Sequence, residues 1–269
     1  MAHIDSVFAG SIPALYDRYL GPLLFEPYAE DLARRLALIA ANRVLETAAG
    51  TGIVTRKLIG LLGETAEIVA TDLNQPMLDF AAAQPSAGRA TWRQADAGSL
   101  PFQDEAFDTV VCQFGVMFFA DKRSAYGEAR RVLKPGGRFI FCVWDRLDQN
   151  ELSQVVNDAV AALFPTDPPR FLARTPYVYH DLDTIRRELA EAGFSSVDAE
   201  TLRFYSRATS ARDAVIGLCQ GSPLRNEIEA RDPEGLGAAT AAAASAVAAR
   251  FGHGPISAQM QAHVITAAA

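Results

Sequence analysis

The sequence predicts an α/β fold, in which a mostly parallel, doubly wound β-sheet is covered by helices on both faces. Short apolar runs alternate with helical stretches between residues 43 and 144, which is typical of parallel strands joined by helical crossovers. The runs are almost continuously apolar, as strands buried on both faces must be. Glycine-containing segments such as Ala48–Gly52 and Lys134–Gly137 separate the runs and predict turns.

The first forty residues precede this alternation and have a helical pattern. Ser11 and Pro13 predict the start of a short helix, with Ser11 as its cap. Apolar residues recur at helical spacing over a second helix from about Pro27 to Ala40. We expect residues 1–40 to form a helical cover outside the sheet domain.

The alternation itself predicts five strands and three connecting helices. The strands are expected at Arg43–Glu46, Glu67–Thr71, Ala90–Ala95, Phe107–Gln113 and Arg138–Trp144. The helices are expected at about Ile53–Leu62, Pro76–Ala83 and Lys122–Leu133. Each of the first four strands is followed by polar or glycine residues, so the strand ends are the natural place for a ligand.

Beyond Trp144 the alternation loosens. Two helices (about Glu151–Leu163 and Asp181–Ala192), a sixth strand (Ser196–Tyr205), a mostly helical segment (210–250) and a last strand (Gln261–Ala267) are expected. We therefore predict a sheet domain over residues 41–209 and 251–269, with 210–250 as a helical insertion that covers the substrate site.

Composition limits the class of protein and partner. The 269 residues carry 25 Lys and Arg against 32 Asp and Glu, a net charge of −7, and 49% of them are hydrophobic. This composition predicts a soluble globular protein. It argues against nucleic acid and against a membrane as partner, because both require a basic surface.

Cysteine usage and the N-terminus predict a cytoplasmic protein. The three cysteines are far apart and form no CxxC pair, which fits a reducing compartment and argues against structural zinc or another bound metal. The first twenty residues lack the apolar core of a signal peptide, and no apolar run reaches the length of a membrane span.

Acidic residues end three successive strands: Glu46, Asp72 and Asp96. The carboxyl ends of parallel strands meet at one edge of the sheet, so these acids are expected close together. A carboxylate at the second strand end can accept hydrogen bonds from both hydroxyls of a ribose, and Asp96 could accept one from an adenine amino group. Gly50 and Gly52 would let the backbone approach the same ligand, and Gln113-Phe114 ends the fourth strand at this edge.

The glycine spacing separates two enzyme classes that share this arrangement. A dinucleotide-binding site requires a third glycine after Gly50 and Gly52, and Thr55 stands there instead. A ligand that contains adenosine but no phosphate does not need that glycine.

Five ordered motifs then resemble one family. They are VLETAAGTG (44–52), TDLN (71–74), ADAGSLPF (95–102), FDTVVCQFG (107–115) and RVLKPGGR (131–138). Over residues 40–205 the chain resembles class I S-adenosylmethionine-dependent methyltransferases, in particular the small-molecule branch of the ubiquinone/menaquinone biosynthesis C-methyltransferases. The resemblance implies a seven-stranded Rossmann-like sheet with an antiparallel last strand.

The resemblance also implies roles for individual residues. Glu46 would orient the glycine loop and the amino end of the cofactor's methionine part. The other implied cofactor contacts are Ala48, Gly50 and Gly52 (methionine part), Asp72 (ribose), Leu73, Asp96 and Ala97 (adenine), and Gln113 and Phe114 (methionine part and substrate mouth). Ala48 departs from the glycine that the family often has at this position. Tyr19 and Tyr16 lie in an N-terminal segment that folds over the cofactor in relatives.

The implied activity is transfer of a methyl group from S-adenosylmethionine to a small molecule, with S-adenosylhomocysteine as product. The displacement is in line, so orientation is the main requirement and a general base is optional. His180 and Tyr16 are weak candidates for such a base. A nucleotide-dependent oxidoreductase and a non-catalytic cofactor-binding protein remain as alternatives, and the sequence leaves a homodimer open.

Overall fold

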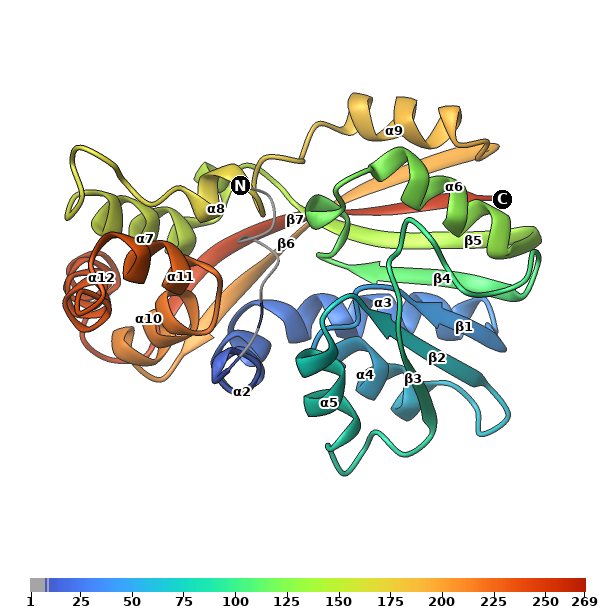
Figure 1. Ribbon diagram of the computed structural model, residues 1–269, viewed down its shortest axis with the longest axis horizontal. Coiled ribbons are helices and arrows are strands. Elements are labelled where there is room, and N and C mark those ends of the chain that lie inside the picture. The colour runs from blue at the N-terminus through green and yellow to red at the C-terminus, as the bar shows by residue number, and fades with distance from the viewer. Residues whose placement is uncertain (1–7, 9) are drawn as a thin grey trace. The chain divides into compact units, whose positions relative to one another are not determined.

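The computed structural model describes residue 8 and residues 10–269, which divide into two compact units (Figure 1). The sheet unit comprises residues 26–143, 180–202 and 263–269. The helical unit comprises residues 144–179 and 203–262 together with the described residues up to Phe25.

Seven strands form one sheet in the order β3-β2-β1-β4-β5-β7-β6. Their bounds are β1 (Arg43–Glu46), β2 (Glu67–Asp72), β3 (Ala90–Gln94), β4 (Phe107–Gln113), β5 (Leu133–Trp144), β6 (Ser196–Ala208) and β7 (Ile256–Ala268). Strands β1 to β5 pair in parallel. The N–H of Ala269 donates to Gly137 of β5, and that of Asp145 donates to Gln261 of β7, so β7 runs antiparallel to β5. The predicted sheet with an antiparallel last strand is confirmed.

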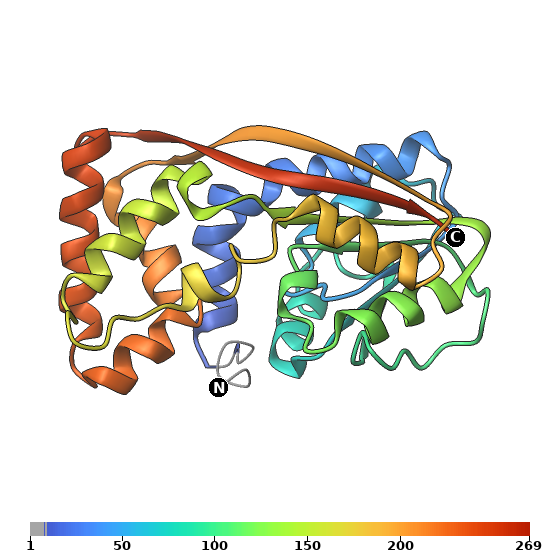
Figure 2. The same ribbon diagram turned by 90° about the horizontal axis from the view of Figure 1, so that it is seen from above.

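The two C-terminal strands are longer than the sequence predicts. Strand β7 begins at Ile256 rather than Gln261, and β6 continues to Ala208 rather than Tyr205. Figure 2 shows them as two long neighbouring strands. Their extra residues belong to the helical unit, where pairing between the two strands continues. Strand β5 includes Leu133 to Gly137, which we expected to form a turn.

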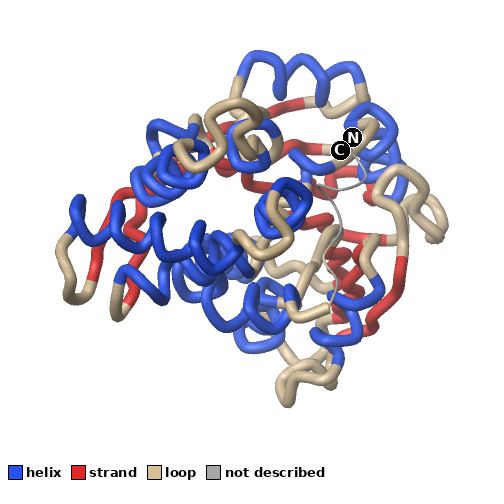
Figure 3. The backbone as a smooth tube through the Cα atoms, turned by 60° about the vertical axis from the view of Figure 1, so that its left-hand side comes forward, coloured by secondary structure: helices blue, strands red, loops and turns tan. Residues whose placement is uncertain are grey.

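Five helices belong to the sheet unit: α3 (Glu26–Leu38), α4 (Ile53–Leu61), α5 (Gln75–Ala82), α6 (Lys122–Val132) and α9 (Leu182–Glu191). Helix α3 packs against α4, and α6 packs against α9. Helices lie on both sides of the strands in this unit (Figure 3). Asp121 and Asp181 cap α6 and α9 through their side chains, which places both helix starts where the sequence predicts them.

The helical unit is built mostly from α7 (Glu151–Ala161), α10 (Ala211–Gln220), α11 (Leu224–Arg231) and α12 (Leu236–Phe251), with shorter elements α2 (Ile12–Leu15), η3 (Leu147–Gln149) and α8 (Phe171–Arg174). A π-helix, η1 (Tyr16–Phe25), continues α2. Helix α10 packs against α12 and η1, and α12 packs against α7.

The predicted cap at Ser11 is wrong. Its side chain makes no capping hydrogen bond to α2, because its hydroxyl instead accepts a bond from Arg225 of α11 at 2.9 Å. Long-range contact within the helical unit has overridden the local capping preference.

The compact units differ from the predicted domain boundaries. Helix α3, which the sequence analysis groups with an N-terminal cover, belongs to the sheet unit and packs against α4. Residues 144–179, which it groups with the sheet domain, belong to the helical unit. In the part of the chain that the structure describes, no helix is both long and apolar enough to cross a membrane.

Candidate functional site

The loop after β1 is bonded to both neighbouring strands. The N–H of Thr47 donates to Val111 of β4, and the N–H of Ala49 donates to Thr71 of β2, each at 2.9 Å. These bonds hold residues 47–52 at the carboxyl edge of the sheet, between the ends of β2 and β4. The predicted meeting of strand ends is therefore present.

Left-handed backbone shapes this loop. Ala48, Gly50 and Gly52 have φ angles of 52°, 55° and 78°. A non-glycine residue in this region is strained by about 1–2 kcal/mol, which explains why relatives favour glycine at the position of Ala48. A Cβ on Gly52 would also lie 2.6 Å from the Trp92 ring of β3, so only glycine fits there.

The end of β4 meets the same loop. Phe114 has a φ of 50°, and its N–H donates to Cys142 of β5 at 3.1 Å. A Cβ on Gly115 would lie 2.4 Å from the Cβ of Ala48 and 2.7 Å from Cys112 Sγ. The two strained loops are thus in direct contact, and backbone strain of this kind gathers at functional sites.

Asp72 ties the glycine loop to β2. It is 7% exposed. Its Oδ2 accepts the N–H of Gly50 at 2.8 Å, and its Oδ1 accepts the N–H of Asn74 at 2.8 Å. Burial raises the pKa of Asp72, while these N–H donors act in the opposite direction. Each carboxylate oxygen has a second lone pair, so the side chain keeps acceptor capacity for a ligand hydroxyl.

Glu46, the last residue of β1, is almost completely buried at 1% exposure. Its Oε2 accepts the hydroxyl of Thr55, in the first turn of α4, at 2.5 Å. The N-cap residue of α4 is Gly52, which has no side chain to offer, and Glu46 supplies an acceptor from the neighbouring strand. Burial raises the pKa of Glu46 to about 8, although the Thr55 hydroxyl lowers it.

The loops after β2 and β3 carry the predicted adenine contacts. Leu73 is 55% exposed, unusual for a leucine beside buried Asp72. Asp96 is exposed, and its Oδ1 accepts the N–H of Gly98 at 2.8 Å, so it shapes its own turn. Ala97 beside it is half-buried.

Comparison with known proteins identifies the family. The sequence profile of a methyltransferase domain matches residues 45–141. The ubiquinone/menaquinone biosynthesis C-methyltransferase UbiE of Pseudomonas aeruginosa is 34% identical over 171 residues, which are 59% of this chain and 67% of that protein. The chain belongs to the class I S-adenosylmethionine-dependent methyltransferases, in the small-molecule branch.

Solved structures agree with this fold. The YcgJ protein of Bacillus subtilis aligns with a TM-score of 0.56 and 20% identity, over 90% of this chain and 98% of that one. The [4+2]-cyclase SpnF aligns with a TM-score of 0.56 and 20% identity, over 91% of this chain and 80% of that one. This methyltransferase uses S-adenosylmethionine as cofactor.

The residues at the carboxyl edge fit that cofactor. Among the described residues, three buried side-chain nitrogen or oxygen atoms lack a hydrogen-bond partner, and two of them are Thr51 Oγ1 and Gln113 Oε1. Both lie at this edge, one in the glycine loop and one at the end of β4. An unpaired buried oxygen is unfavourable by about 1–3 kcal/mol, and polar groups of a bound ligand would relieve that penalty.

The other predicted residues of the methyltransferase lie in different settings. Phe114 is buried at 6% exposure, and its ring packs edge-on against Tyr28 of α3 with centroids 5.2 Å apart. Tyr16 and Tyr19 are in η1 of the helical unit, where Tyr16 stacks on Phe25. His180 is half-buried next to the α9 cap Asp181.

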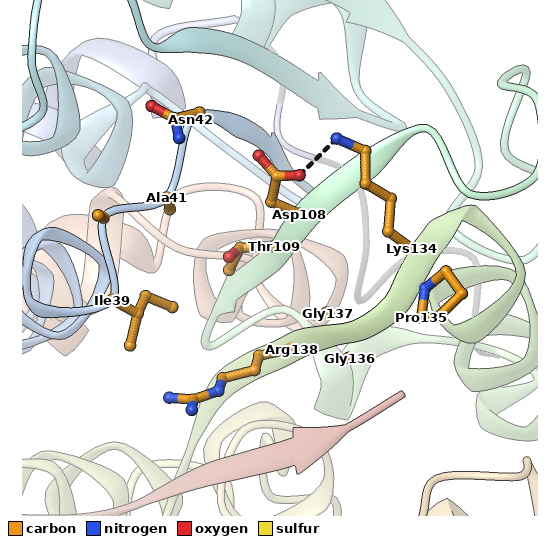
Figure 4. A pocket seen from close by; sticks show the side chains of 11 residues that line it. Ile39, Ala41, Asn42, Asp108, Thr109, Lys134, Pro135, Gly136, Gly137 and Arg138 are labelled. Atoms are coloured by element: carbon orange, nitrogen blue, oxygen red, sulfur yellow. Dashed lines mark hydrogen bonds and ion pairs between the residues drawn. The ribbon is translucent and has the colours of Figure 1, made fainter.

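A cavity of about 360 Å³ lies at the opposite, amino edge of the sheet (Figure 4). Its rim carries an ion pair between Asp108 of β4 and Lys134 of β5, with 2.5 Å between Oδ1 and Nζ. Ligands of doubly wound sheets bind at the carboxyl edge, so we place the cofactor in the loops there and not in this cavity.

Three residues of the site are absent from the sequence-based set: Thr51, Trp92 and Gly115. Their roles depend on contacts between loops that are distant in sequence. Thr55 is noted in the sequence only as the residue that replaces a third glycine. Its position four residues after Thr51, at the start of a predicted helix, was the available signal for a role in holding the strand end.

Proposed function

We propose that the protein transfers the methyl group of S-adenosylmethionine to a small-molecule acceptor by in-line displacement. The observation that carries this proposal is the clasp between Asp72 and the Gly50 N–H, beside the unpaired oxygens of Thr51 and Gln113. The relatives with 34% identity are C-methyltransferases of quinone biosynthesis, which favours a carbon atom of an apolar acceptor.

Residue roles at the carboxyl edge follow from position and exposure. Asp72 accepts from the ribose hydroxyls, and exposed Leu73 covers one face of the adenine. Asp96 and Ala97 line the adenine edge. Ala48, Gly50 and Gly52 bring the backbone close to the methionine part, and Gln113 offers its unpaired oxygen there. Phe114 contributes its strained backbone, because its ring is packed against Tyr28.

The chemistry asks mainly for orientation. When bound, the cofactor supplies a methyl group on a sulfonium, which is already a good leaving group. The chain's task is to hold the acceptor atom behind that methyl group and to exclude water, and such positioning can contribute about 7–11 kcal/mol. A base is required only if the acceptor loses a proton, and His180 and Tyr16 are the candidates for it.

We assign recognition of the acceptor to the helical unit. Its aromatic side chains form a connected group: Tyr16 stacks on Phe25 at 4.8 Å, Phe25 lies 6.2 Å from Trp144, and Trp144 lies 5.8 Å from Tyr177. Such a group suits an apolar or aromatic acceptor. A net charge of −7 opposes a nucleic-acid acceptor, and three unpaired cysteines suit the cytoplasm.

Calorimetry with S-adenosylmethionine, S-adenosylhomocysteine, NAD and NADP tests this proposal. We expect both sulfur ligands to bind and neither dinucleotide to do so. Asp72→Ala should weaken binding about 10- to 100-fold, because two charge-assisted hydrogen bonds are lost. Asp108→Asn, an acid at the opposite edge of the sheet, is the control and should bind like the wild type. Binding of NAD alone would establish the oxidoreductase alternative instead.

A further inference from the structure

Thr55 and Glu46 form a buried pair beneath the glycine loop. Thr55 is completely buried, Glu46 is 1% exposed, and the Thr55 hydroxyl lies 2.5 Å from Glu46 Oε2. Among the described residues, Thr55 is the only one whose side chain donates a hydrogen bond to this carboxyl group. At this depth Glu46 acts on a ligand in the loop through its charge and not through direct contact.

The surroundings of Glu46 oppose a negative charge while no ligand is bound. Asp72 of β2 and the Cys112 thiol of β4 face it, and the Asp72 carboxylate disfavours a second charge. Arg56 of α4 is the one cation that favours the charge, and its Nη1 donates to the carbonyl of Thr51 at 2.6 Å. With burial raising its pKa to about 8, Glu46 holds a proton at neutral pH in the free protein.

The cofactor carries an ammonium group at its methionine end, which the proposed function places at the glycine loop. An opposite charge nearby favours the ionised form of a carboxyl group. We infer that Thr55 is a positioning residue that holds Glu46 as a buried counter-charge to this ammonium group, and that Glu46 releases its proton when the cofactor binds. The O–H bond of the carboxyl group breaks, the proton passes to the solvent, and the Thr55 hydroxyl stabilises the carboxylate that remains.

The pair gives a reason for the residue at position 55. A glycine there, as in a dinucleotide-binding loop, would leave Glu46 without a side-chain donor. Valine would preserve the shape of threonine but remove the hydroxyl. Thr55→Val and Thr55→Ser therefore separate the hydrogen bond from the packing.

The number of protons released can be measured by calorimetry of S-adenosylhomocysteine binding in buffers with different ionisation enthalpies. The ligand's own amino group titrates at about 7.7–8.0, so Glu46→Gln serves as the matched control. At pH 7 we expect the wild type to release at least about half a proton more than Glu46→Gln. This difference should vanish at about pH 9.5, where Glu46 is already ionised.

The Thr55 variants test the positioning role. Thr55→Val removes a donor that stabilises the carboxylate, so the pH at which the proton difference is lost should move upward, and affinity at pH 7 should fall about 10-fold. Thr55→Ser should follow the wild type. Equal release by wild type and Glu46→Gln would overturn the inference, and a wild-type pH profile in Thr55→Val would overturn the role of Thr55. Neither result affects the proposed function, which would fail only if the sulfur ligand did not bind to the wild type.

Discussion

Glu46 and Asp108 are both acids of central strands, but their surroundings move their pKa values in opposite directions. Burial dominates at Glu46 and raises its pKa to about 8. At Asp108 partial burial acts the same way but is outweighed by Lys134 and by the N–H of Arg43, so its pKa is lowered. An identical kind of side chain is thus a proton store at one edge of the sheet and a fixed charge at the other.

The raised pKa of Glu46 makes stability depend on pH. The unfolded chain ionises Glu46 near pH 4.3, whereas the folded protein retains the proton up to about pH 8. This group therefore favours folding fully below its unfolded pKa, and the benefit is lost as pH rises through the folded value. We expect Glu46→Gln to gain stability relative to the wild type between about pH 5 and 8, with a constant difference above that range. Thermal melts across pH without ligand measure this, and a difference that shrinks with pH would contradict it.

Gly115 tests the contact between the two strained loops. Gly115→Ala would place a methyl group 2.4 Å from the Cβ of Ala48, and overpacking of this kind destabilises by about 1–3 kcal/mol. In an Ala48→Gly background the opposing methyl group is absent, so the same change should be clearly less destabilising. Denaturant unfolding of both single variants and the double variant gives the coupling energy. Strict additivity would show that the loops are not in contact.

At the scale of elements, helix α6 holds the loop between β3 and β4. The guanidinium of Arg131 donates to Glu128, to Asp104, and to the carbonyls of Leu100 and Phe102. Glu128 in turn accepts the N–H of Leu100 at 2.7 Å. The loop that carries Asp96 and Ala97 is thus fixed from its far end by a helix that begins after β4.

Arg131→Gln should destabilise the protein by about 1–2 kcal/mol and also weaken cofactor binding, because the loop loses several hydrogen bonds at once. Arg138→Gln on β5 is the matched control: Arg138 is exposed and forms no ion pair with any described residue. Unfolding and binding measurements on the two variants should differ accordingly. Equal behaviour of both variants would mean that α6 does not hold the loop.

At the scale of the whole molecule, the chain forms a sheet unit with the cofactor loops and a helical unit with the aromatic group. Strands β6 and β7 contribute residues to both units. The division of labour that we propose makes the helical unit responsible for the acceptor. Its behaviour on cofactor binding is therefore informative.

We expect cofactor to slow proteolysis in residues 10–25 and 210–250, which belong to the helical unit. Limited proteolysis with and without S-adenosylhomocysteine, with cleavage sites read by mass spectrometry, measures this. Residues 61–66, a surface turn between α4 and β2, are an internal reference whose cleavage should not change. Unchanged cleavage of both helical segments would argue against their role as a cover.

The sequence by itself determined most of the sheet unit. Strands β1 and β4 have the predicted bounds, because short buried strands are encoded by local apolar runs. The acids at the strand ends were also predictable, since parallel strands end at one edge.

Only the tertiary structure decided what depends on distant partners. Ser11 bonds to Arg225 and not to its own helix, and α3 joins the sheet unit through α4. The Thr55–Glu46 pair and the unpaired oxygens of Thr51 and Gln113 arise from burial, which no local pattern specifies. Local propensity sets where strands and helices begin, but burial and contact between loops set which oxygen is paired and which acid holds a proton.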